Sequence, residues 1–296
     1  MRIFLEYYAL KGVLLLTKLL PIPLIYGFCK LLATLFFTLD KRRRTITLQN
    51  LALAYPHKTE DERYTLAKNI YKSVAISIAE MLLMMHQRLD IDAMVSNYEE
   101  ALHELKLYFD DVNRGKLLLT AHFGNWELLA HFLAKHGYPM VVIGRKGNNH
   151  LIEEHITTPF RTRYGNTLAH KSKAMAAIVR VLNQKKIAGM LIDQKSGGSS
   201  SIKINFFGHP ADTINSIGLL KLRYDPSVVP LFMARQSDGR YKLIIGSTQE
   251  IVLPEELNET EHIKRLTQHY NDIIEAVIKE YPEQWFWMHD RWRLFK

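Results

Sequence analysis

The 296-residue sequence has little of what many catalytic and structural sites require. Its single cysteine, Cys29, excludes an intramolecular disulfide, a zinc site built on cysteines and a CxxC redox centre. Fifteen glycines and ten prolines are too few for a collagen-like or disordered chain. The sequence also has no HExxH, Walker, dinucleotide-binding or GxSxG motif. Any chemistry must come from histidine, carboxylate, hydroxyl or basic side chains, and we expect neither a metal nor a cofactor.

Positive charge is concentrated in two regions. The formal net charge is +9, and the run Lys41–Arg44 consists of four basic residues. Residues 135–186 contain ten basic side chains and two acidic ones. Such clusters favour an anionic partner: a nucleic acid, a phosphorylated lipid, an anionic membrane or an acidic protein. The alternative is a solvated basic face with no dedicated partner.

An apolar run extends from Gly12 to Leu39, interrupted by Lys18, Lys30 and the break at 21–23. Its uninterrupted stretches are shorter than the ~20 apolar residues of a spanning helix. Three interpretations remain open: one tilted span with lysines reaching the interface, a pair of helices lying in the interface, or a buried core hairpin.

The basic run at 41–44 favours membrane association, because basic residues bind anionic lipid surfaces. Basic flanks also tend to stay in the cytoplasm. We therefore expect a hydrophobic helical membrane segment at residues 1–44 and one cytoplasmic-facing domain at residues 45–296. The single cysteine is compatible with a reducing compartment.

Hydrophobic patterning predicts an α/β fold. Thr59 and Glu62 form a capping box that begins a helix ending near Gln87. Beyond residue 115, short apolar runs alternate with amphipathic segments, which predicts a mixed sheet with helices on both faces. The expected strands are 116–120, 140–143, 187–192, 202–206, 228–234 and 241–246, and the expected helices are 126–135, 174–184, 213–222 and 261–280. Ligands of such sheets bind beyond the carboxyl ends of strands.

The segment from His122 to Glu127 follows the first of these strands. Asn125 is a good helix N-cap, which places Glu127 in the first helical turn. On one continuous helix a spacing of five would set the two side chains about 140° apart. They can meet if His122 lies in the turn before the helix, and Gly124 permits such a turn.

A His122–Glu127 pair has a clear chemical use. The carboxylate accepts from one imidazole nitrogen and fixes the tautomer, and the other nitrogen takes a proton from an attacking hydroxyl. Because no enzyme nucleophile is evident, the acceptor alcohol would attack directly. By spacing alone, the alternative is equally open: a chain with thirteen histidines has such pairs by chance, and His122 then merely ends a strand.

The sequence resembles the late, or secondary, lipid A acyltransferases (lauroyl and myristoyl transferases), within the His-x4-Asp/Glu glycerolipid acyltransferase superfamily. HFGNWE at 122–127 is similar to the superfamily's defining motif. Further blocks follow in the family's order: 50–56 (NLALAYP), 145–149 with 161–165 (R-x-x-N and R-x-R), 191–194 (LIDQ), 206–208 (FFG) and 283–289 (EQWFWMH).

The resemblance implies transfer of a fatty acyl chain from an acyl carrier protein thioester to a hydroxyl of a phosphorylated, Kdo-bearing lipid A precursor. It implies His122 as general base, Glu127 as its orienting partner and no covalent acyl-enzyme. It also implies action in lipopolysaccharide biosynthesis at the bacterial inner membrane.

The same resemblance suggests substrate-binding residues. Arg161 matches a required arginine that we expect to bind phosphate or the developing anion, with Arg163 as the alternative. Asp193 matches a required position, with either a catalytic or a structural role. Asn125 either caps the helix or touches the acceptor, and Arg145 belongs to the R-x-x-N block.

The expected partners are an acidic acyl carrier protein on the basic region 135–186, the lipid A precursor and the membrane surface, with no nucleic acid. The aromatic and basic tail at 285–296 either lies in the membrane interface or is a core strand followed by an amphipathic end. One alternative function is an acyl-CoA-dependent glycerolipid or glycolipid acyltransferase. A more distant one is a membrane-anchored anion- or nucleic-acid-binding protein without chemistry.

Overall fold

A six-stranded sheet forms the centre of the fold, with strand order β3-β2-β4-β1-β7-β8. The computed structural model describes residues 1–144, 147–170 and 174–295. All neighbouring strands of this sheet are parallel except β8, which runs antiparallel to β7. The bounds are β1 (Lys116–Thr120), β2 (Met140–Gly144), β3 (Thr167–His170), β4 (Ile187–Leu191), β7 (Ser227–Arg235) and β8 (Tyr241–Ile245). The prediction of a mixed sheet is confirmed.

Helices cover both faces of the sheet, as the patterning predicts. Successive strand residues point to opposite faces, so Leu117 and Leu119 pack in one core while Leu118 packs in the other. The first core is closed by α9 (Ala174–Asn183), α10 (Ser216–Tyr224) and α11 (Glu259–Glu280), and the second by α5 (Tyr98–Phe109) and α6 (Trp126–Lys135).

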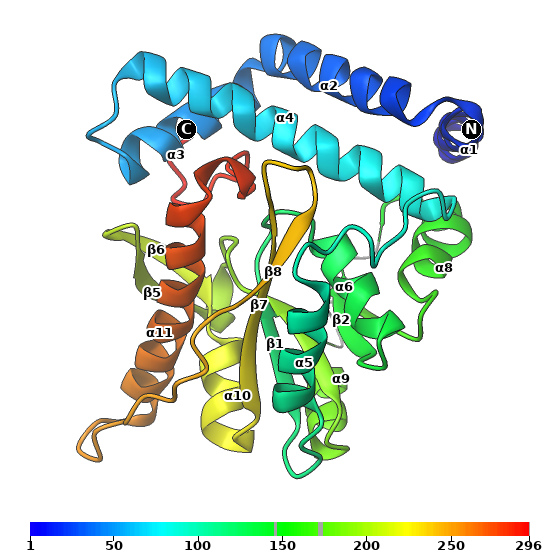
Figure 1. The fold of residues 1–296 in the computed structure, drawn as a ribbon. Helices are drawn as coiled ribbons and strands as arrows, with labels where there is room; N and C mark the ends of the chain where they lie inside the picture. Colours follow the sequence, from blue (N-terminus) through cyan, green and yellow to red (C-terminus); the bar gives the residue numbers. More distant parts are fainter. Residues whose placement is uncertain (145–146, 171–173, 296) are drawn as a thin grey trace.

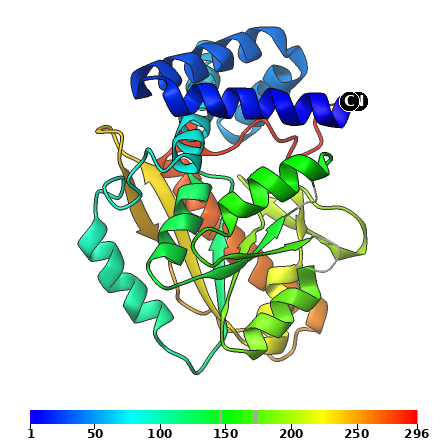
Figure 2. The same ribbon diagram turned by 90° about the vertical axis from the view of Figure 1, so that its right-hand side faces the viewer.

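Four N-terminal helices lie across one end of the sheet (Figures 1 and 2). They are α1 (Arg2–Leu19), α2 (Ile22–Leu39), α3 (Lys41–Ala54) and α4 (Glu60–Met85). The chain breaks between α1 and α2 at Pro21, and α4 begins at the predicted capping box of Thr59 and Glu62. Helix α2 packs along α4, with Ile25 and Cys29 in the same apolar cluster as Ala79.

The apolar N-terminal run is a surface pair of helices, which excludes the buried hairpin. Phe28, Leu31, Leu32, Leu35 and Phe36 of α2 are all exposed. Within the described residues, only α2 is long and apolar enough to cross a membrane, and 17% of it is buried. A large exposed apolar face of this kind marks a contact with lipid or another protein.

Several short elements complete the fold, and some differ from prediction. A second sheet pairs β5 (Ser201–Phe206) antiparallel with β6 (His209–Ile214). The helix predicted at 213–222 therefore starts later, at Ser216, because Thr213 and Ile214 pair with β5.

The patterning missed α5, β3 and the short helical turns α7 (His150–Ile152), Glu153–Thr157 and α8 (Thr158–Arg161).

The C-terminal tail packs in the core. Trp285, Trp287 and Arg291 are fully buried. The Arg291 guanidinium donates to the Asp212 carbonyl and the Thr213 hydroxyl, and its burial lowers its pKa to about 10. The structure therefore buries much of the tail up to Arg291 and leaves Arg293 exposed. In place of the expected strand, Trp285 forms an isolated bridge with Phe123.

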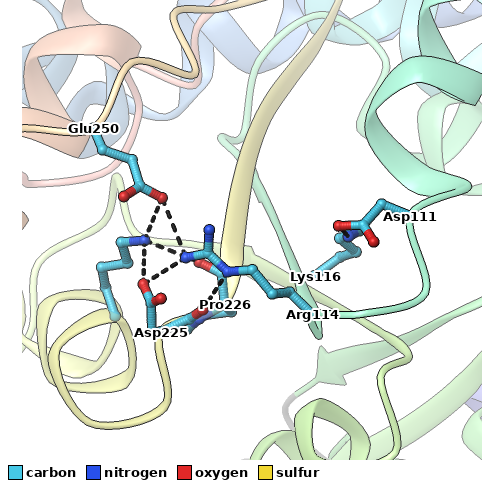
Figure 3. Close-up of polar contacts among 7 residues, drawn as sticks. Asp111, Arg114, Lys116, Asp225, Pro226 and Glu250 are labelled. Atoms are coloured by element: carbon cyan, nitrogen blue, oxygen red, sulfur yellow. Dashed lines mark hydrogen bonds and ion pairs between the residues drawn. The ribbon is translucent and has the colours of Figure 1, made fainter.

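At the other end of the sheet, near the start of β1 and β7, a cluster of ion pairs connects three loops of the chain (Figure 3). The largely buried Lys221 amine lies 2.6 Å from both the Asp225 and the Glu250 carboxylates. Arg114 contacts the same two carboxylates at 2.5 and 3.2 Å. This cluster fixes the loops at the amino ends of the strands, opposite the end covered by α4.

Candidate active site

His122 and Asp193 meet because their strands are neighbours. Strands β1 and β4 are parallel, and Thr120 is paired with Leu191. Two residues beyond this pair, His122 Nδ1 lies 3.0 Å from Asp193 Oδ1. The His122 backbone N–H and the Trp285 indole N–H donate to Asp193 Oδ2 at 3.1 and 2.8 Å. The three donors orient the Asp193 carboxylate toward the imidazole.

Electrostatics fixes the tautomer of His122. Burial raises the pKa of Asp193, but His122 and the Trp285 indole outweigh burial, so the pKa lies below its usual value. An ionised carboxylate only accepts hydrogen bonds. The Nδ1 atom of His122 therefore carries the proton, and its Nε2 atom keeps a lone pair that can act as a base.

The expected His122–Glu127 hydrogen bond is not formed, and this prediction was wrong. Among the described contacts, Glu127 instead accepts from Arg161: Nε lies 3.1 and 3.2 Å from the two carboxylate oxygens, and a terminal nitrogen contacts Oε1. Asp193 occupies the orienting position because it extends directly from the neighbouring strand. Glu127 acts on His122 only through space, by helping to raise its pKa.

The turn between β1 and α6 is clamped from two sides. Gly124 has a φ of +55°. Its N–H donates to the Gln284 carbonyl at 2.9 Å, and its carbonyl accepts from the Ser77 hydroxyl at 3.0 Å. Asn125 then caps α6 by accepting from the Leu128 N–H. The turn permits His122 to precede the helix, as the sequence predicts.

A buried carboxylate that the sequence analysis missed supports this turn. Glu80 of α4 is fully buried and accepts from the Asn125 amide at 2.9 Å and from the Tyr241 hydroxyl at 2.7 Å. Arg235 forms an ion pair with it. An acidic residue inside the apolar sequence IAEMLLMM was the available signal, because a buried charge requires a partner.

A cavity of about 500 Å³ reaches the His122 ring at the carboxyl ends of β1, β2 and β4. This is where ligands bind in such sheets. Its polar wall consists of Thr120, His122, Glu127, Arg161, Gln194, Lys195, Ser196, Ser200 and Ser216. Its apolar wall includes Leu118, Trp126, Leu129, Met140, Val142, Ile178 and Met190. The cavity therefore offers a ligand both apolar and polar surface beside one imidazole.

Comparison with known protein families identifies the family of the chain that carries this site. The family described as bacterial lipid A biosynthesis acyltransferase matches residues 1–294. The chain belongs to this family. It is therefore an acyltransferase of lipid A biosynthesis, as the resemblance of its sequence blocks implied.

Its similarity to individual lipid A acyltransferases is modest in identity but extends over most of the chain. It is 25% identical to a lipid A biosynthesis acyltransferase of Haemophilus influenzae, over 93% of this chain and 86% of that protein. It is 26% identical to the lipid A biosynthesis lauroyltransferase of Escherichia coli, over 95% of this chain and 89% of that protein. It is 22% identical to the lipid A biosynthesis myristoyltransferase of the same species, over 84% of this chain and 75% of that protein.

The remaining predicted residues fall into different groups in this lipid A acyltransferase. Arg161 lines the cavity. Arg163 does not, since it donates to the Met84 and Met85 carbonyls at the end of α4. Asn125 has the capping role described above. Arg145 lies outside the described residues.

The activity is expected to rise with pH as His122 loses its proton, because a general base acts only when deprotonated. Burial lowers the pKa of His122, but the Asp193 and Glu127 carboxylates more than offset burial, so the pKa lies above the ordinary 6.5. The acid limb of kcat/KM plotted against pH should therefore have its midpoint above 6.5. A midpoint below that value would contradict the assignment of His122 as the base.

Proposed function

We propose that this acyltransferase moves a fatty acyl chain from an acyl carrier protein thioester to a hydroxyl of a phosphorylated lipid A precursor, with His122 as general base. One observation carries the mechanism: an imidazole held by a buried carboxylate lines a largely apolar cavity. The family supplies the substrate class, and the donor and the roles of the residues are our inference.

The reaction proceeds by direct attack. The acceptor hydroxyl gives its proton to His122 Nε2 as its oxygen bonds to the thioester carbonyl carbon. Asp193 stabilises the resulting imidazolium. The tetrahedral intermediate then collapses, the carbon–sulfur bond breaks, and the proton on Nε2 passes to the leaving thiolate. An ester and a free thiol result, with no acyl-enzyme.

We assign to Arg161 the stabilisation of the negative charge that develops on the thioester carbonyl oxygen during the reaction. It lines the cavity, and although burial lowers its pKa, Glu127 raises the pKa further, so it stays charged. A fixed cation beside the carbonyl oxygen stabilises the oxyanion as it develops. Glu127 holds the guanidinium in place through a forked pair. The two motif residues thus contact different partners: His122 is paired with Asp193, and Glu127 is paired with Arg161.

We also propose that α1 and α2 lie in the membrane interface, with the catalytic domain on the cytoplasmic side. Helix α2 uses one face to pack on α4 and leaves large apolar side chains exposed on the other. If α2 crossed the bilayer, it would lose its packing on α4, because α4 has three carboxylates in its first turn and cannot follow α2 into the lipid. If α2 lies in the interface of one leaflet, it can contact α4 and lipid at the same time.

The basic region 135–186 supports carrier-protein docking less than its charge suggests. Its described basic residues are partly used inside the molecule: Arg161 pairs with Glu127, Arg163 caps α4, and Lys135 lies 2.9 Å from Asp92. The acyl carrier protein donor therefore depends on the family resemblance and on the net charge of +9, which attracts an acidic protein.

Donor competition tests the proposed function. The purified protein is given a lipid A precursor with equal concentrations of acyl carrier protein and CoA thioesters that carry chains of different length. Mass spectrometry of the product then identifies which donor was used. We expect the carrier-linked chain to dominate and the His122→Ala variant to form no product.

Two outcomes would contradict the proposal. Dominance of the CoA-linked chain would replace the donor with acyl-CoA and leave the acyltransferase mechanism intact. Undiminished product from His122→Ala would remove the general base.

A further inference from the structure

Five cations from three separate parts of the chain form a basic rim next to the cavity. They are Lys41, Arg42, Arg43, Lys195 and Arg293, and all five are exposed. The first three begin α3, Lys195 follows β4, and Arg293 lies in the C-terminal tail. No sequence pattern indicated that these segments would meet.

Side-chain contacts connect the rim from one end to the other. The Arg293 guanidinium donates to the Ser196 carbonyl at 2.7 Å, and both Lys195 and Ser196 line the cavity. The Arg42 guanidinium lies 5.4 Å from the centre of the Phe295 ring, two residues beyond Arg293. The basic rim therefore runs from the cavity wall to the start of α3.

The rim keeps a positive charge although some of its members are paired. Lys195 lies 3.3 Å from Asp290, and Arg293 lies 3.4 Å from Asp212. The guanidinium groups of the other two arginines have uncharged described contacts: that of Arg42 lies over the Phe295 ring, and that of Arg43 donates to the Met288 carbonyl. The nearby Asp40 carboxylate caps α3 by accepting from the Arg43 backbone N–H. Neither a ring nor a carbonyl neutralises a guanidinium, so both can still bind an anion.

The position of the rim favours a lipid over a soluble partner. Only Asp40 separates Lys41 from α2, which ends at Leu39, and Phe36 and Leu39 at that end are exposed apolar residues. A lipid whose chains enter the cavity or lie beside α2 would hold its head group against the rim. Guanidinium groups match the geometry of phosphate oxygens.

We propose that the basic rim binds the phosphate of the acceptor lipid's head group. This inference rests on the proposed function, which supplies the acceptor. It assigns phosphate binding to the three cations at the start of α3, with Lys195 and Arg293 connecting the rim to the cavity. It leaves Arg161, which is held by Glu127, for the reaction centre.

The test compares the wild-type protein with a Lys41→Gln/Arg42→Gln variant, which leaves Arg43 and its contact with the Met288 carbonyl in place. The acceptor is a phosphorylated, Kdo-bearing lipid A precursor in uncharged detergent micelles, assayed alongside the same precursor after phosphatase treatment. Each basic residue near an anionic surface is worth about fivefold in affinity. We expect the KM for the phosphorylated acceptor to rise about 30-fold, with kcat and the donor KM unchanged. The dephosphorylated acceptor should not distinguish the two proteins.

A control variant, Lys106→Gln/Arg265→Gln, removes one exposed charge from α5 and one from near the start of α11, both outside the basic region 135–186, and should leave every constant unchanged. Three results would overturn the proposal: a rise in the donor KM alone, which assigns the rim to the carrier protein; loss of binding to anionic vesicles with an unchanged KM in micelles, which assigns it to the bilayer; or an equal effect in the control. Absence of transfer by the wild-type protein would instead refute the proposed function.

Discussion

Replacing Asp193 by asparagine is expected to lower kcat by about 10⁴-fold. Asparagine has nearly the same shape and can still accept from the Trp285 indole, so the buried site should remain folded. It lacks the negative charge that stabilises the imidazolium, and its amide can donate to Nδ1, which favours the wrong tautomer of His122. Steady-state kinetics with saturating donor and acceptor measure the effect, and circular dichroism and thermal unfolding confirm the fold.

The Glu127→Gln variant provides the contrast. It removes the charge that holds Arg161 but leaves the Asp193–His122 pair intact, so we expect a smaller loss in kcat, about 10²-fold. If Glu127→Gln proves more damaging than Asp193→Asn, then Glu127 is the orienting carboxylate, as the spacing in the sequence first suggested, and the assignment of Asp193 is wrong.

Substitution of Gly124 by alanine is expected to destabilise the fold by about 4 kcal/mol or more. An alanine Cβ at this position would lie 1.7 Å from the Met233 carbonyl oxygen, and the φ of +55° adds strain. The Met233 carbonyl belongs to β7, so relief of the clash must move either the sheet or the turn that carries His122. Urea unfolding and the yield of soluble protein measure the loss.

Gly137→Ala separates the clash from the strain. Gly137 also has a positive φ, of +90°, but an alanine Cβ there would meet no other atom within 4 Å. We therefore expect it to cost about 1 kcal/mol, from backbone conformation alone. Similar losses for the two variants would show that close packing against β7 does not constrain the turn.

Local patterns predicted most of the elements around the site. The capping box of Thr59 and Glu62 begins α4, and the segments that became β1, β4 and α6 were identified to within a residue or two. These signals depend on neighbours in the chain. The β6 strand was missed because its sequence, HPADTI, contains a proline, and because its pairing with β5 depends on a tight turn at Phe207 and Gly208.

The site itself was predicted only in part. The sequence identified His122, Arg161 and Asp193, and it placed His122 and Asp193 near strand ends. Glu80 and Trp285, which hold the turn and the Asp193 carboxylate, come from positions far along the chain. Their roles depend on packing between α4, the C-terminal segment and the sheet, which no local pattern specifies.

The sequence by itself determined the family to which the chain belongs and the helix that follows His122, and it indicated the side chains of the proposed site. Only the tertiary structure decided which carboxylate serves the imidazole. Strand order is the physical reason: pairing β1 with β4 brings the ends of segments 71 residues apart within hydrogen-bond distance, whereas Glu127, five residues from His122, is turned by its helix toward Arg161.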